Sequence, residues 1–142
     1  MRQLIKKARN QITICSCEYT TKYDFILSEE ITNQLDNGVN VSIYGNKLDQ
    51  MKSLRKNWKG VNELRVFSWN EPRAKSLFHI KAITIDNNHC YLGSANFSRN
   101  AMKNSVEWGI ITHSTDLCLD LESYIKQLVD DGLFSEVVDS DM

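Results

Sequence analysis

One stretch of the sequence gathers several chemically demanding side chains at fixed offsets. It reads His79-Ile80-Lys81, four residues, Asp86, six residues, and then Gly93-Ser94-Ala95-Asn96. A lysine ammonium can hold a phosphate oxygen as a point charge, and a neutral imidazole can attack phosphorus or shuttle a proton. Backbone N–H groups, a serine hydroxyl and an asparagine amide where a strand opens into a helix add further contacts for an anion. These residue types therefore predict a site for a phosphate ester.

The local pattern predicts how these side chains are presented. Residues 78–85 alternate in the manner of a strand rich in β-branched side chains. A period of two puts His79 and Lys81 on the same side, about 7 Å apart along the strand. Asn87-Asn88 favours a turn, and residues 89–92 return as a second strand, so we expect a β-hairpin.

Each part of this stretch also has an ordinary structural interpretation. An isolated His-x-Lys pair on a strand is usually an exposed face, Asn-Asn is usually only a turn, and Gly-Ser-x-Asn is usually only a helix start. Their joint spacing favours the chemical interpretation.

The whole pattern resembles the HKD motif of the phospholipase D superfamily. The resemblance covers most of the chain, because the basic segment Lys6–Arg9 before a strand and the join at Asn37-Gly38 follow the family's usual layout. It implies an α/β sandwich in which helices flank a central mixed β-sheet. It also implies a metal-independent phosphodiesterase that needs no cofactor.

The resemblance assigns a role to each motif residue. His79 would be the nucleophile that forms a covalent phosphohistidine, and Lys81 would grip the non-bridging oxygens. Ser94 and Asn96 would position the phosphate. Asp86 matches the motif aspartate and is counted with the catalytic residues, although ordering the turn is its favoured role.

Glu107 is a further catalytic candidate. It lies downstream of the Gly-Ser segment, where many family members carry an acid. A carboxylate that accepts a hydrogen bond from one imidazole nitrogen would leave the other nitrogen free to attack. A surface glutamate without a role is the equally weighted alternative.

The two-step route needs a second histidine to protonate the leaving oxygen and later to activate water. His89 and His113 lack the surrounding pattern. Single-motif family members, the Nuc-type endonucleases and mitochondrial cardiolipin hydrolases, supply this histidine from a second subunit. We therefore expect a homodimer with one shared active site on its two-fold axis.

Nucleic acid is the favoured substrate, with DNA preferred to RNA. Four basic residues flank the motif and could contact a phosphate backbone: Arg73, Lys75, Arg99 and Lys103. Trp58 and Trp69 could stack on bases, although burial in the core is the favoured role for both. One alternative is a phospholipid hydrolase of the phospholipase D or cardiolipin type. Another is a non-catalytic nucleic-acid-binding subunit of a restriction or phage-defence assembly.

Composition bounds the class of protein. Hydrophobic residues make up 42% and charged residues 25% of the 142 residues, as in ordinary soluble globular proteins. No apolar run of about 18 residues predicts a transmembrane helix, and the first residues lack the apolar core of a signal peptide, so a cytoplasmic location is expected. The four cysteines show no metal-ligand spacing, and we expect reduced thiols and no metal site.

Charge is distributed unevenly along the chain. Residues 116–142 hold eight acidic residues and one basic residue, which leaves 16 basic against 10 acidic residues elsewhere. A basic body is compatible with a polyanionic substrate. We expect one catalytic domain over residues 1–135 and a flexible acidic tail over residues 136–142.

The hydrophobic pattern predicts alternating helices and strands, and hence an α/β fold. Helices are expected over residues 1–8, 25–36, 48–58, 98–102 and 115–131, and strands over residues 11–17, 39–44, 64–69, 105–112 and the motif hairpin.

Overall fold

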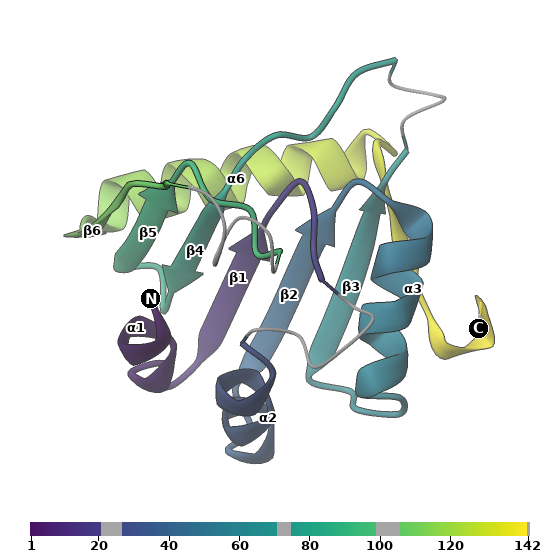
Figure 1. Cartoon of the computed structure of the whole chain (residues 1–142), viewed down its shortest axis with the longest axis horizontal. Coiled ribbons are helices and arrows are strands. Elements are labelled where there is room, and N and C mark those ends of the chain that lie inside the picture. The colour runs from purple at the N-terminus through teal and green to yellow at the C-terminus, as the bar shows by residue number, and fades with distance from the viewer. Residues whose placement is uncertain (21–26, 71–74, 99–105, 142) are drawn as a thin grey trace.

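The computed structural model describes residues 1–20, 27–70, 75–98 and 106–141 (Figure 1). Within these residues, seven strands form one sheet in the order β6-β5-β4-β1-β2-β3-β7. The strands are β1 (Gln11–Cys15), β2 (Asn40–Gly45), β3 (Leu64–Trp69), β4 (Ala82–Ile85), β5 (His89–Gly93), β6 (Gly109–His113) and β7 (Phe134–Val137). β1, β2 and β3 run parallel to one another, whereas every other pairing is antiparallel. The expected mixed sheet is confirmed.

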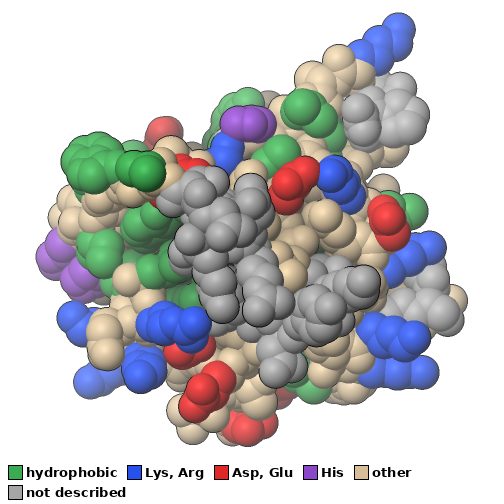
Figure 2. Space-filling view, viewed as in Figure 1, with side chains coloured by type: hydrophobic (Ala, Val, Ile, Leu, Met, Phe, Trp, Pro, Cys, Tyr) green, Lys and Arg blue, Asp and Glu red, His purple; other side chains and the backbone are tan. Residues whose placement is uncertain are grey.

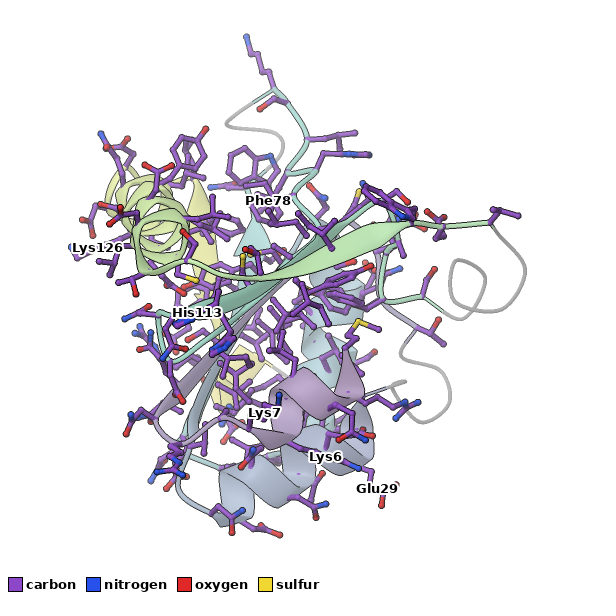
Figure 3. All side chains as sticks on the ribbon, turned by 90° about the vertical axis from the view of Figure 1, so that its left-hand side faces the viewer. Lys6, Lys7, Glu29, Phe78, His113 and Lys126 are labelled. Carbon is purple, nitrogen blue, oxygen red and sulfur yellow. The ribbon has the colours of Figure 1, made fainter. Side chains whose placement is uncertain are left out.

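Helices cover both faces of this sheet. Three of them, α1 (Arg2–Lys6), α2 (Ser28–Asp36) and α3 (Leu48–Asn57), lie on the face nearer the viewer in Figure 1, and α6 (Thr115–Asp130) crosses the other face. Figure 3 shows the same division, with Lys126 on one side of the sheet and Lys6 and Lys7 on the other. The chain is therefore a three-layer α/β sandwich.

Period-two alternation sends successive residues of each central strand into two separate cores. Ile14 and Ile43 pack into the core under α1, α2 and α3, whereas their neighbours Cys15 and Tyr44 pack into the core under α6. Because both faces are covered, the central strands are apolar on both sides, as parallel strands usually are.

The last helix, α6, buries one narrow stripe against the sheet. Ser114 caps α6 by accepting a hydrogen bond from the Leu117 N–H at 3.2 Å, as expected for a serine at this position. Leu117 is 37% exposed, while Cys118 and Ile125 are buried. The buried stripe is centred on Cys118 and Ile125, seven residues apart, and this places Leu117 at its rim.

The acidic C-terminal segment, where we expected a flexible tail from residue 136, packs against the rest of the chain. Phe134–Val137 form β7, which pairs with β3. Glu136 forms an ion pair with Arg65 at 2.8 Å, and Asp139 forms one with Arg55 at 2.9 Å. The acidic residues indicated a solvated tail because no basic residues lie near them in the sequence. Their partners, Arg55 and Arg65, are brought beside them only by the fold.

Several predicted boundaries also change. The motif strand begins at Ala82, not at Phe78, and the strand predicted over residues 105–112 is Gly109–His113. The helix predicted over residues 25–36 is described from Ser28, and the helix predicted over 98–102 falls mostly outside the described residues. All four cysteines are free thiols, and Cys17 is only half-buried. No helix in the described segments has both the length and the apolar character needed to cross a bilayer.

Candidate functional site

Four of the motif residues, His79, Lys81, Ser94 and Asn96, lie at the end of the sheet where β1 and β2 end. β1 continues into Ser16 and Cys17, and β2 continues into Asn46. β4 runs antiparallel to β1, so the residues just before it lie at this same end. A hydrogen bond from the Gly93 N–H to the Lys81 carbonyl, at 3.3 Å, brings the end of β5 there as well. Ligands of open α/β sheets commonly bind outside the carboxyl ends of the strands.

His79 and Lys81 are in direct contact at this end of the sheet. The Lys81 Nζ lies 2.8 Å from His79 Nδ1 and 3.4 Å from Nε2. An ammonium only donates hydrogen bonds, so the imidazole nitrogen that faces it must present its lone pair. The His79 side chain is exposed and that of Lys81 is half-buried. The Lys81 ammonium, a cation, and the His79 imidazole, a potential nucleophile, therefore lie side by side at a solvent-accessible position.

Asn46 fixes the main chain that carries His79, a role that the sequence did not reveal. Its side chain is buried, its Oδ1 accepts from the Phe78 N–H at 2.8 Å, and its Nδ2 donates to the Phe78 carbonyl. Nδ2 also lies 3.2 Å from Cys17 Sγ. The available signal in the sequence was a polar residue directly after a buried parallel strand.

Asn96 is anchored to the end of β1. Its Oδ1 accepts from the Cys17 N–H at 3.2 Å and lies 3.4 Å from Ser16 Oγ. Ser16 Oγ in turn accepts from the Phe97 N–H at 3.0 Å. With Oδ1 engaged in this way, the Nδ2 group of Asn96 is the part of its side chain that can donate to an anion.

Ser94 and Glu107 contact each other instead of the imidazole. The Ser94 hydroxyl donates to a Glu107 carboxylate oxygen and accepts from the Trp108 N–H at 3.1 Å. The Ser94 N–H donates to the Trp108 carbonyl at 3.0 Å. Both Ser94 and Glu107 are exposed. Within this chain, Glu107 therefore orients the serine, whereas the two alternatives considered for it were a hydrogen bond from a histidine and a surface position without a role.

Asp86 lies at the opposite end of β4, about 16 Å of strand from Lys81. Its carboxylate accepts from the backbone N–H groups of Arg9, Asn10 and Gln11 at 2.9, 2.8 and 2.9 Å. Desolvation raises the pKa of Asp86, but these three bonds and the Arg9 charge outweigh it, and the pKa falls below its usual value. Asp86 therefore ties the hairpin turn to the start of β1, which was its favoured role, and lies away from His79 and Lys81 within this chain.

Tyr91 is a second residue that the sequence analysis missed. Its ring lies across Gly93 and Gly109, where a Cβ on Gly109 would meet the ring at 2.6 Å. Burial and the nearby Glu107 charge raise the pKa of the Tyr91 hydroxyl. Two glycines facing each other on neighbouring strands were the signal for this close approach.

The other histidines lie away from the site. His89 and His113 pair across β5 and β6 and stack with their ring centroids 4.4 Å apart. They occupy the end of β5 opposite to Gly93, and Figure 3 shows His113 below Phe78, the residue before His79. Neither histidine meets His79 within one chain. Among the described residues, no three His, Cys, Asp or Glu side chains cluster to hold a metal ion.

Most of the predicted nucleic-acid contacts fall outside the described residues, namely Arg73, Arg99 and Lys103. Lys75 is described and exposed. Trp58 and Trp69 are buried, and their indole N–H groups donate to Thr32 Oγ1 at 2.9 Å and to the Ser76 carbonyl at 2.7 Å. Both tryptophans therefore belong to the core, which was their favoured role.

Comparison with known proteins identifies the family. Residues 1–129 match the family described as cardiolipin synthase, PLD-like domain. A curated relative, the DISARM protein DrmC of Bacillus paralicheniformis, is 25% identical over an alignment of 141 residues that covers 97% of this chain and 58% of the relative. The chain thus spans little more than half the length of that protein.

Solved structures give the same fold. NucT from Helicobacter pylori superposes with a TM-score of 0.74 at 22% identity, over 91% of this chain and 84% of NucT. Nuc from Salmonella typhimurium, a phospholipase D family member, superposes with a TM-score of 0.70 at 20% identity, over 96% of this chain and 88% of Nuc. The fold, the motif and the family match agree, and the chain belongs to the phospholipase D-like family.

Proposed function

We propose that the protein is a phosphodiesterase that cleaves nucleic acid through a covalent intermediate on His79. The observation that carries this proposal is the 2.8 Å contact between Lys81 Nζ and His79 Nδ1 at the open edge of the sheet. A phosphate bound there would draw Lys81 onto a non-bridging oxygen and leave the imidazole lone pair facing phosphorus. Ser94 and the Nδ2 group of Asn96 lie on the segment that follows and would hold the remaining oxygens.

The reaction proceeds in two displacements. A His79 nitrogen attacks phosphorus, the P–N bond forms, and the P–O bond to the leaving alcohol breaks while a general acid supplies its proton. Water, deprotonated by the same group, then attacks phosphorus. The P–N bond breaks, which frees His79 and releases a phosphate monoester.

The general acid and base is His79 of the partner subunit. Since His89 and His113 lie at the other end of β5, the single chain places no second imidazole near His79 among its described residues. A two-fold axis beside the site would bring the two copies of His79 together, so the active form is a homodimer.

Nucleic acid is favoured over lipid by charge. The chain outside residues 116–142 has six more basic than acidic residues, and Lys75 lies exposed just before the motif. The likeness to a DISARM protein longer than this chain supports a place in a larger defence assembly.

Cleavage of single- and double-stranded DNA and of RNA in excess EDTA tests this proposal. We expect wild type to cleave and His79→Ala to be inactive, while His113→Ala, a matched exposed histidine away from the site, stays active. Equal cleavage by wild type and His79→Ala would overturn it. Hydrolysis of a phospholipid and of no polymer would instead favour the lipid alternative.

A further inference from the structure

Trp108 differs from the other tryptophans of the chain. The sequence has three, and Trp58 and Trp69 are 7% and 8% exposed, whereas Trp108 is 77% exposed. Folded proteins rarely leave so large an aromatic side chain in water, and exposed apolar surface of this kind commonly marks a binding site. The indole of Trp108 is therefore a candidate contact for a ligand.

The main chain holds this indole beside the candidate phosphate site. Trp108 forms two hydrogen bonds with Ser94, from its N–H to Ser94 Oγ at 3.1 Å and from the Ser94 N–H to its carbonyl at 3.0 Å. Its neighbour Glu107 binds the same hydroxyl. The backbone that carries the indole is therefore hydrogen-bonded directly to Ser94, the serine expected to contact phosphate.

Exposed apolar side chains continue from Trp108 along β6, an edge strand of the sheet. Ile110 and Ile111 are both exposed there, on opposite faces of the strand. Figure 2 shows hydrophobic side chains gathered on the left of this face, over β5 and β6. A ligand whose phosphate lies at Lys81 would thus meet an aromatic surface next to it.

We propose that Trp108 stacks on the nucleobase adjacent to the phosphate that His79 attacks, so that the substrate is single-stranded at that base. This inference rests on the proposed function. Every base has a flat π-face that an indole can cover, but in a duplex both faces are already stacked on neighbouring bases. An aromatic ring next to a lysine that binds phosphate is the combination that single-stranded nucleic-acid sites use.

The first test compares two single-stranded oligonucleotides that differ only in one abasic residue beside the scissile phosphate. Trp108→Ala should raise KM for the intact oligonucleotide by about tenfold and leave KM for the abasic one unchanged. Trp108→Phe should recover most of the difference. Leu119→Ala, at an exposed apolar residue on α6 outside this surface, should leave both values unchanged. Equal effects of Trp108→Ala on both oligonucleotides would overturn the stacking role.

Tryptophan fluorescence gives a test that does not depend on cleavage. Because Trp58 and Trp69 are buried, quenching by acrylamide reports mainly on Trp108. In His79→Ala, the intact oligonucleotide should protect Trp108 from acrylamide, and the abasic one should not. Shielding of Trp108 in the free protein, with a change of oligomeric state in Trp108→Ala, would assign the residue to the dimer interface instead. If wild type cleaves no polymer, the proposed function fails, while protection from quenching still decides whether Trp108 stacks.

Discussion

The side-chain amide of Asn46 brackets the main chain of Phe78, accepting from its N–H at 2.8 Å and donating to its carbonyl. The two residues lie 32 positions apart in the sequence, and the next residue after Phe78 is His79. The proposed nucleophile therefore follows a residue whose backbone is held from the end of β2, two strands away from β4 in the sheet.

We expect Asn46→Ala to leave both Phe78 groups buried without a partner, which should lower the free energy of unfolding by about 2–3 kcal/mol. Misplacing the imidazole by about 1 Å should lower kcat for cleavage by on the order of 100-fold. Urea denaturation and steady-state kinetics measure the two effects. Asn62→Ala, at an exposed asparagine, is the control. A less stable variant with unchanged kcat would show that Asn46 supports the fold and not the nucleophile.

Ser94 and Glu107 should behave as one unit in a double-mutant cycle. Ser94→Ala and Glu107→Gln should each slow cleavage by on the order of 100-fold, because each removes the oriented hydroxyl from the phosphate. The double variant should be about as slow as either single one. Glu29→Gln, on α2 across the molecule, is the control (Figure 3). Multiplying effects in the double variant would mean that the two side chains act separately.

Asp86 predicts a pH dependence of stability. Its pKa in the folded protein is lowered, so its contribution is present above the ordinary carboxyl pKa and disappears as the pH falls through the lowered value. At neutral pH, Asp86→Asn should lower the free energy of unfolding by about 1–2 kcal/mol, and this difference from wild type should shrink as the solution is acidified.

Urea denaturation between neutral and strongly acidic pH measures this dependence. Asp120→Asn, at an exposed carboxylate on α6, serves as the control. A deficit in Asp86→Asn that stays constant over the whole pH range would argue against the backbone bonds as its cause.

Arg55 tests whether the C-terminal segment is part of the fold. Its buried guanidinium donates to the Leu64 carbonyl at 2.6 Å, to the Val61 carbonyl at 3.1 Å and to Asp139 at 2.9 Å. Arg55→Met should lower the free energy of unfolding by about 2–3 kcal/mol, because these carbonyls lose their donor. Lys56→Met, at an exposed neighbour, should have little effect. Equal stability of the two variants in urea would mean that the contacts of Arg55, including the one with Asp139 in the C-terminal segment, do not stabilise the fold.

Local patterns predicted much of the fold. Alternation in residues 64–69 and the serine cap at residue 114 act over a few positions, so one sequence was enough to place β3 and the start of α6. The contact between His79 and Lys81 is also local, because the two residues lie only two positions apart, just before the first residue of β4.

Contacts between distant segments could not be predicted in this way. Nothing in the spacing of the motif indicates that the Asn46 side chain forms hydrogen bonds with the Phe78 main chain, or that Glu107 accepts a hydrogen bond from Ser94. The strand β7 was missed for the same reason. The acidic residues Glu136 and Asp139 indicate exposure to solvent in the sequence, and only the fold places Arg65 and Arg55 beside them. In each case the two contacting residues are brought together only by the order and pairing of the strands in the sheet.

The Asp86 carboxylate joins the motif hairpin to residues more than 70 positions earlier in the chain. Such long-range closures form late, because the entropy of a large loop must be lost before its contacts can compensate. The motif by itself is therefore not a catalytic unit. A partly folded chain could carry every residue from His79 to Asn96 and still lack a working site, so catalysis would begin only once β1, β2 and β4 are together.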